Sequence, residues 1–325
     1  MEKAALFRQP LQINRLTVRN RIVMPPMATG KAVNGAPGED LAAYYRERAK
    51  GTGLIIVEHE YVLLQGMAHK DQLSMADDSV IPAYHRLTGA VHEEGAGIIA
   101  QISHAGIKAK DSGLPAVGPS AVSNKEGAVS EELTKEGIDT IIKAFAAAAV
   151  RAKEAGFDGV EIHSAHGYLL NQFYSPLTNL REDEYSVRTM GNRTRIHCEI
   201  IHAVRAAVGA DYAVAIRFGA CDYTEGGSNV SDIPAAAKAF EEAGVDLIDI
   251  SGGANGFMIP GHTEPGYFKE LSLAAKTAVR IPVLLTGGVT AVQDMEALLA
   301  EGAADLIGVG RAMMRNAAWS REALA

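Results

Sequence analysis

Short apolar runs alternate with longer amphipathic stretches along the whole chain. Most of the short runs are rich in valine and isoleucine and show no regular polar alternation, which is typical of parallel strands buried on both faces. The pattern predicts eight strands, over residues 22–24, 54–57, 98–102, 159–162, 213–218, 247–250, 283–285 and 306–309. The amphipathic stretches predict helices over residues 40–50, 81–94, 133–155, 192–208, 233–243, 270–279 and 293–300.

Eight strands with helices between them favour an α/β fold, the (β/α)8 TIM barrel. Several of the predicted helices end at a glycine, which is a common way to stop a helix before a short loop. A doubly wound sheet is the alternative, but the early G-x-G-x-x-G turn that such a sheet normally carries is missing. Because no Pro-, Gly- or Ser-rich linker divides the chain, we expect a single domain over residues 1–325.

The longest irregular segments, residues 58–79, 104–130 and 163–190, each follow a predicted strand. Loops of this length inside a compact domain are usually functional. In a barrel they would lie at the carboxyl ends of the strands, where active sites are built. We therefore expect a site that is assembled from several loops.

Charge and composition restrict the class of function. The 325 residues include 31 Lys and Arg against 39 Asp and Glu, a formal net charge of −8, which argues against a general nucleic-acid-binding protein. The two cysteines, Cys198 and Cys221, cannot form a disulfide framework. The N-terminus lacks a signal-peptide profile, and no apolar stretch reaches the roughly 18–20 residues of a membrane helix. We expect a cytoplasmic protein that does not bind a membrane.

The densest group of chemically useful side chains follows the fourth predicted strand. His163, His166 and Tyr168 are close neighbours in the sequence and can bring three hydrogen-bonding groups to one pocket. Two other interpretations stay open. The three residues can be ordinary solvated loop residues, or the histidines can bind a metal, although the neighbouring sequence offers no obvious further ligand.

Other candidate residues lie at or within further strands. Gln101 lies near the end of the third predicted strand and can pair with both a donor and an acceptor on a heterocycle, unless it only satisfies polar groups at the barrel mouth. Arg217 lies inside an apolar strand and needs an anionic partner, from the protein or from a ligand. Pro25 and Pro26 follow the first strand, where they predict a rigid turn.

Glycines after the last two strands indicate a site for an anion. Gly287 and Gly288 follow the seventh predicted strand, and Gly310 and Arg311 follow the eighth. Glycines allow backbone N–H groups to approach an anion, and the loops after strands 7 and 8 of barrels commonly bind phosphate. Glycines that serve only tight loops are the alternative. We infer a phosphate-bearing ligand.

In this order, the segments resemble the Old Yellow Enzyme family of FMN-dependent ene-reductases. The resemblance covers essentially the whole chain and depends on the order of its motifs. The motifs are residues 20–27, Gln101 with 104–106, 155–163, 166–169, 175–179 with Arg181, Asp183 and Tyr185, Asn192 with Arg193, and the glycine pairs with Arg311.

The resemblance implies a role for each candidate residue. Non-covalent FMN would contact Pro25, Pro26, Met27 and Ala28 along its ring, Gln101 at its pyrimidine edge, Arg217 at N1 and O2, and Gly287, Gly288, Gly310 and Arg311 at its phosphate. His163 and His166 would hold the carbonyl or nitro oxygen of an activated alkene, and Tyr168 would donate a proton. The resemblance also implies NADH or NADPH as reductant and a homo-oligomer.

The sequence departs from the family pattern at several positions. Ala28 stands where relatives commonly have Cys or Thr, and Thr29 and Gly30 provide no aromatic wall. His59 stands where Ala or Gly is frequent, and we include it among the flavin-contacting candidates. Ser186 and Val187 replace a common Gly-Gly, and no iron–sulfur segment follows Arg311, so nicotinamide is expected to reduce the flavin directly.

The resemblance therefore implies an FMN-dependent NAD(P)H ene-reductase, and we expect no metal. An FMN barrel that works as a dehydrogenase on an amine or cyclic donor is the first alternative. A flavin-binding sensor and a metal-dependent hydrolase that uses His163 and His166 are two others.

Overall fold

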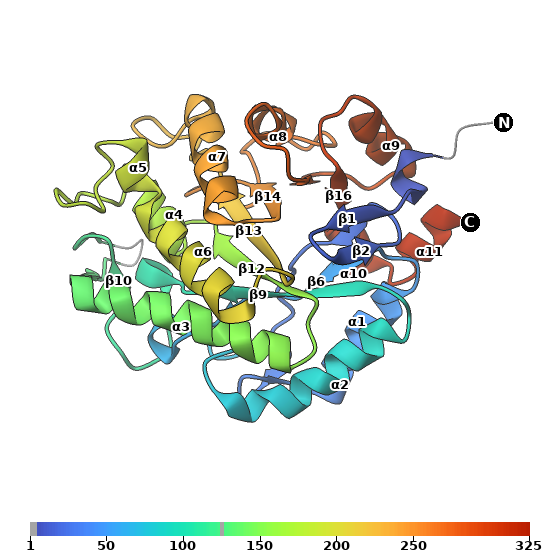
Figure 1. Cartoon of the computed structure of the whole chain (residues 1–325), viewed down its shortest axis with the longest axis horizontal. Helices are drawn as coiled ribbons and strands as arrows, with labels where there is room; N and C mark the ends of the chain where they lie inside the picture. Colours follow the sequence, from blue (N-terminus) through green and yellow to red (C-terminus); the bar gives the residue numbers. More distant parts are fainter. Residues whose placement is uncertain (1–4, 124–126) are drawn as a thin grey trace.

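The computed structural model describes residues 5–123 and 127–325, and its centre is a closed barrel of eight parallel strands (Figure 1). The strands are β3 (Ile22–Met24), β6 (Leu54–Ile56), β9 (Gly97–Ser103), β12 (Gly159–Ser164), β13 (Ala213–Gly219), β14 (Leu247–Ser251), β15 (Val283–Thr286) and β16 (Leu306–Gly308). They pair in this order, and β16 pairs with β3 to close the barrel. The TIM barrel expected from the sequence is confirmed, and the doubly wound alternative is wrong.

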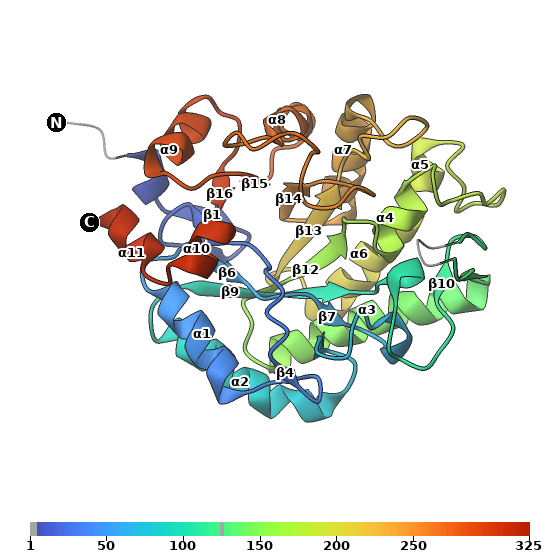
Figure 2. The same ribbon diagram turned by 180° about the vertical axis from the view of Figure 1, so that it is seen from behind.

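Helices surround the barrel on its outside, as Figures 1 and 2 show from opposite sides. The main ones are α1 (Glu39–Ala49), α2 (Ile81–His92), α3 (Lys135–Glu154), α6 (Arg195–Val208), α7 (Ile233–Ala243), α8 (Lys269–Lys276) and α9 (Val292–Ala300). The helix predicted over 192–208 is divided at Thr194, whose backbone N–H still bonds to Met190 of the short helix α5 (Met190–Arg193). No helix among the described residues is both long and apolar enough to cross a membrane.

The hydrophobic pattern missed several short elements. They are α4 (Leu169–Tyr174), α10 (Arg311–Arg315), α11 (Trp319–Leu324) and the strand pairs β1 (Leu11–Ile13) with β2 (Leu16–Val18), β4 (Ala32–Val33) with β5 (Ala36–Pro37), β7 (Glu60–Tyr61) with β8 (Leu73–Ser74), and β10 (Val117–Gly118) with β11 (Glu131–Glu132). Elements of two to six residues are too short to establish a periodicity. Four of them, β7, β8, β10 and α4, interrupt the three segments predicted to be irregular. Residues 124–126 of the second segment lie outside the described residues.

The part of the barrel interior nearest the amino ends of the strands is apolar. Its filling includes Val23, Leu54, Ile99, Leu247 and Leu284, and all of them are fully buried. The β1–β2 hairpin covers the amino ends of the strands, where the Asn14 side chain donates hydrogen bonds to the Ala210 carbonyl and to Asp246. The hairpin therefore closes one end of the barrel and leaves the carboxyl ends of the strands for the site.

A polar layer lies next to this apolar filling, nearer the carboxyl ends of the strands. Gln101 of β9 is in register with Glu161 of β12, and Arg217 of β13 is in register with Asp249 of β14. All four side chains are buried. Because residues in register on adjacent strands share a face of the sheet, these pairs form neighbouring polar contacts within the barrel.

Candidate active site

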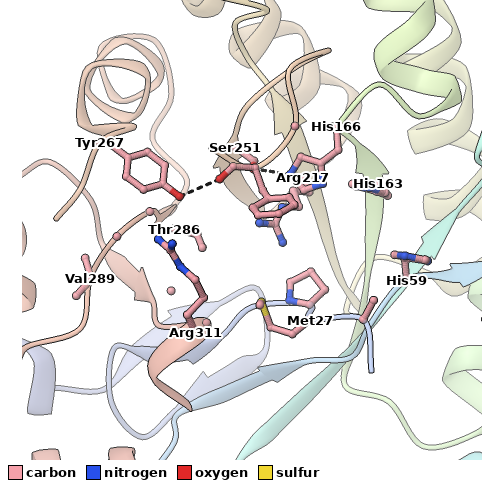
Figure 3. Close-up of a pocket in the computed structure, with 18 of the residues that line it drawn as sticks. Met27, His59, His163, His166, Arg217, Ser251, Tyr267, Thr286, Val289 and Arg311 are labelled. Carbon is pink, nitrogen blue, oxygen red and sulfur yellow. Dashed lines mark hydrogen bonds between the residues drawn. The ribbon is translucent and has the colours of Figure 1, made fainter. Parts of the chain in front are cut away.

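A pocket of about 500 Å³ opens at the carboxyl ends of the barrel strands (Figure 3). Figure 3 shows Arg217, His166 and Ser251 on one side of this pocket and Met27 with Arg311 on the other. The structure brings most of the sequence-predicted residues to its wall: Pro26, Met27, Ala28, His59, His163, His166, Tyr168, Arg217, Gly287, Gly288, Gly310 and Arg311. Pro25 and Gln101 are buried and are not among the residues that line the pocket.

The two histidines reach the pocket from the end of β12. His163 belongs to the strand, whereas His166 and Gly167 both have left-handed backbone conformations, with φ of 60° and 68°. A left-handed conformation is uncommon for a residue other than glycine and is often found at functional sites. Hydrogen bonds hold the turn, because the Gly167 N–H donates to Asn171 Oδ1 and the Lys108 ammonium donates to the His166 carbonyl.

This turn gathers three rings. The His163 ring centroid lies 5.1 Å from that of His166 and 4.9 Å from that of Tyr168. His166 Nε2 is 2.7 Å from the Ser251 hydroxyl, so Ser251 fixes this ring (Figure 3). His163 Nδ1 is buried without a hydrogen-bond partner among the described residues. The imidazole of His163 therefore has hydrogen-bonding capacity that the protein leaves unused.

Burial keeps these groups uncharged. Desolvation, with a smaller contribution from the charge of Arg217, holds the pKa values of His163 and His166 well below the ordinary value. Burial also raises the pKa of Tyr168 to about 12, which keeps the phenol protonated. The pocket consequently presents neutral hydrogen-bonding groups rather than imidazolium cations.

The buried arginine Arg217 supplies positive charge close to His163 and His166. Arg217 Nε is 3.4 Å from Asp249 Oδ2, and Arg217 Nη1 has no hydrogen-bond partner among the described residues. Burial raises the pKa of Asp249, while Arg217 opposes that rise. Next to this pair, Gln101 Nε2 donates to Glu161 Oε1 at 2.8 Å. A guanidinium does not deprotonate in proteins, so Arg217 retains donors for an anionic or carbonyl edge of a ligand.

On the opposite side of the pocket, the backbone of the glycines packs closely against other residues. A Cβ atom at Gly310 would lie 2.9 Å from Met27 Sδ, and one at Gly287 would lie 3.0 Å from the Tyr267 ring. Gly288 also has a φ of 72°, a conformation that side chains rarely adopt. Arg311 comes directly after Gly310 and is exposed. The arrangement of small residues and one cation fits a phosphate group, and the unpartnered donors of Arg217 fit a flavin ring.

Sequence reasoning did not assign roles to several residues at the site. Asp249 could have been found, because it is a charged residue within an apolar strand, the same signal that singled out Arg217. Ser251 at the end of β14, Lys108 and Tyr267 also line the pocket. The latter two lie outside the predicted strands and helices, and nothing in the local sequence pattern marks them.

A metal bound by His163 and His166 would need further ligands from the protein. Within residues 5–123 and 127–325, no three His, Cys, Asp or Glu side chains gather as a metal site would require. The ring nitrogen of His166 is instead engaged by a hydroxyl group.

Comparison with known proteins gives the family. The model of the NADH:flavin oxidoreductase / NADH oxidase family matches residues 5–324. The chain is 41% identical over 324 residues to an NADH oxidase of Thermoanaerobacter brockii, covering 96% of this chain and 50% of that protein. It is 39% identical to an NADPH dehydrogenase of Geobacillus thermodenitrificans, covering 95% of this chain and 91% of that protein.

A solved structure supports the same assignment. An Old Yellow Enzyme homologue from Zymomonas mobilis superposes with a TM-score of 0.86 and 29% identity, covering 98% of this chain and 92% of that one. The chain belongs to the NADH:flavin oxidoreductase family, the family of Old Yellow Enzyme. The expected cofactors, FMN with NADH or NADPH, are confirmed at the level of the family. The chain spans about half the length of the NADH oxidase that it matches.

Proposed function

We propose that this chain is an FMN-dependent NAD(P)H ene-reductase that reduces activated C=C bonds of α,β-unsaturated carbonyl or nitro compounds. The observation that carries the proposal is the convergence of two neutral imidazoles and a protonated phenol on one pocket. This set can bind an oxygen atom and deliver a proton, which are the two tasks that an alkene reduction asks of the protein.

The pocket residues would hold FMN between its two sides. Gly287, Gly288, Gly310 and Arg311 would bind the phosphate, and Arg217 would face the pyrimidine part of the flavin. Pro26, Met27 and Ala28 would line the ring, with Pro25 and Gln101 supporting it from behind the pocket wall. When bound, FMN supplies the hydride that it has received from NADH or NADPH.

The substrate would lie against the histidines. As neutral donors, His163 and His166 would bind the carbonyl or nitro oxygen of the alkene, and they would stabilise the negative charge that develops on this oxygen. Because burial holds the pKa values of both histidines well below the ordinary value, the rings are neutral near pH 7, and each can donate one N–H without carrying a charge.

Tyr168 would be the proton donor. A phenol with a pKa of about 12 is a weak acid, yet a weak acid in the correct position is sufficient to protonate a strongly basic carbon. The proton would pass from the Tyr168 hydroxyl to the carbon next to the carbonyl or nitro group. The Tyr168 ring lies 4.9 Å from that of His163, so one substrate can contact both groups.

Turnover with paired substrates tests the proposal. Purified protein loaded with FMN should consume NADH or NADPH with a cyclic enone, a nitroalkene or an unsaturated ester, and one of these should yield the saturated product. The dehydrogenase alternative predicts the reverse: flavin reduction by an amine or a cyclic donor and no turnover of the alkenes. A protein that binds FMN but turns over neither set would favour the sensor alternative.

We also propose that residues 1–325 act as one FMN-binding barrel domain. The cytoplasmic location and the homo-oligomeric state expected from the sequence remain predictions.

A further inference from the structure

A chain of hydrogen bonds leads to Tyr168 from the loop that follows β6. The backbone N–H of Ala68 donates to Gln72 Oε1 at 2.6 Å, and Gln72 Nε2 lies 2.6 Å from His59 Nδ1. On the other side of the same ring, His59 Nε2 lies 3.5 Å from the Tyr168 hydroxyl. The proposed reaction gives no role to His59 or Gln72.

The direction of this chain follows from the donors and acceptors available. A backbone N–H can only donate, so Ala68 must face the oxygen of the Gln72 amide and the amide nitrogen must face His59. An amide nitrogen also only donates, so His59 Nδ1 is the acceptor. The single proton of a neutral imidazole is then on Nε2, the nitrogen that faces Tyr168.

The surroundings of both residues support this arrangement. Gln72 is 1% exposed, and its amide nitrogen also lies 3.3 Å from the His59 carbonyl oxygen and 3.4 Å from the Ser103 hydroxyl. Burial, followed by the nearby His69, lowers the pKa of His59 to about 4. The ring is therefore neutral near pH 7, and the buried amide has little freedom to turn over.

We propose that His59 is a positioning residue for Tyr168, donating an Nε2–H hydrogen bond to the phenolic oxygen. This bond leaves the phenolic proton free to point into the pocket, and it stabilises the phenolate that remains when the proton leaves. The proton moves from the Tyr168 oxygen to the substrate carbon, while His59 keeps its own proton. The phenolate then takes up a proton from water.

The inference rests on the proposed function only for the role of Tyr168, so its first test is independent of activity. Nitrogen-15 NMR of histidine-labelled protein distinguishes the two neutral tautomers of an imidazole. The His59 signal, assigned by its loss in His59→Leu, should show a protonated Nε2 and an unprotonated Nδ1. A protonated Nδ1 or a charged ring would overturn the proposal.

Two variants test the origin of the tautomer. Gln72→Leu removes the donor to Nδ1 at nearly constant volume, so the preference for the Nε2–H tautomer should weaken or disappear. Gln65→Leu is the matched control in the same loop, because the Gln65 amide donates its hydrogen bond to the Pro115 carbonyl. An unchanged His59 signal in Gln72→Leu would contradict the assigned direction of the chain.

A double-mutant cycle tests the action through Tyr168. With Tyr168 present, His59→Leu should slow the half-reaction with an enone by about tenfold, the usual value of one hydrogen bond. In the Tyr168→Phe background the same change should have almost no further effect. His59→Gln, which retains an N–H donor, should recover most of the rate.

The outcomes separate the two proposals. Equal slowing by His59→Leu in both backgrounds would show that His59 acts directly on the substrate or on the fold, and it would overturn the positioning role. Wild-type protein that reduces no alkene would contradict the proposed function. In that case the NMR result still decides whether His59 carries its proton on Nε2, the nitrogen that faces Tyr168.

Discussion

The residues of the pocket differ from the same residues in water mainly through burial. His163 and His166 would titrate near neutral pH if they were exposed, whereas desolvation in the barrel mouth holds their pKa values well below that range. Tyr168 changes in the opposite sense, because the charged form of a phenol is its deprotonated form. The same physical cause therefore produces two neutral donors and one protonated acid.

Tyr168→Phe retains the ring and its packing and removes the proton. We expect the half-reaction with NADH or NADPH to stay within a few-fold of wild type, and the half-reaction with an enone to slow by about 10²–10⁴-fold, the usual contribution of a general acid. Nitroalkenes should be affected less, because a nitronate is stable enough to leave before it is protonated. Stopped-flow measurement of both half-reactions decides this. Equal slowing of the two would indicate a structural role.

His163→Ala removes a neutral donor from the same pocket. Binding of phenolate-type inhibitors and turnover of enones should weaken by about a hundredfold, the usual effect of losing one hydrogen bond to a developing oxyanion. Titration of the flavin absorbance with a phenol measures the binding. The control is His202→Ala, an exposed histidine on α6. Normal phenol binding by His163→Ala would mean that another pair of donors holds the oxygen.

The loops after β15 and β16 form the side of the pocket that lies opposite Arg217 and His166. Glycines follow each strand, and their backbone lies close to Met27 and Tyr267. Arg311 begins the short helix α10 and adds a charge at this point. The glycines and the arginine therefore act together, although two different strands supply them.

Arg311→Ala tests the phosphate side of the site. The loss of one charge-assisted hydrogen bond should weaken FMN binding by about tenfold to a hundredfold. Equilibrium dialysis of FMN against the apoprotein measures this change. Arg315→Ala is the matched control, since Arg315 is an exposed arginine of the same helix and does not line the pocket. If both variants retained FMN equally well, Arg311 would have no contact with the phosphate.

Two glycines in regular elements should respond to alanine in opposite directions. Gly89 lies within α2, where an added methyl group would find open space, so Gly89→Ala should stabilise the fold by about 0.5–1 kcal/mol. Gly159 begins β12, where a Cβ atom would lie 2.6 Å from the Ala213 carbonyl oxygen, so Gly159→Ala should cost about 1–3 kcal/mol. Urea unfolding gives both values, and a destabilised Gly89→Ala would contradict this description of α2.

The whole molecule combines an apolar barrel floor with a polar layer under the pocket. Glu161 is fully buried in that layer, and desolvation, followed by repulsion from Asp249, raises its pKa. A folded state with a raised carboxyl pKa holds its proton more tightly than the unfolded chain. The stability that this group contributes is fully present below its ordinary pKa of 4.5 and is lost as the pH rises through the folded value.

Glu161→Gln tests this dependence. The glutamine retains an oxygen for the Gln101 hydrogen bond and has no proton to lose. Between about pH 5 and about pH 8, wild-type apoprotein should lose more unfolding free energy than the variant, at a rate of at most about 1.4 kcal/mol per pH unit. Urea unfolding at the two pH values measures the difference. Parallel pH profiles would mean that Glu161 ionises normally in the folded protein.

Much of the architecture could be predicted from the sequence. Barrel strands such as 22–24 were found because burial on both faces makes each of them an unbroken apolar run. Helices such as 233–243 were found because burial on one face repeats along the helix. The hairpin of β1 and β2 and the helix α4 were not found, because three to six residues cannot show a period. His163, His166 and Arg217 were found because polar residues stand out at the end of, or inside, an apolar run.

The sequence by itself determined the barrel, its family and most residues of the pocket wall, since local apolar patterns and motif order are properties of the chain alone. Tertiary structure alone decided which groups meet. The contact between His59 and Tyr168 joins residues 109 positions apart, and that between Gln101 and Glu161 joins residues 60 positions apart. Burial, and with it the protonation of the site, depends on every strand that closes the barrel. No single segment of the sequence carries that information.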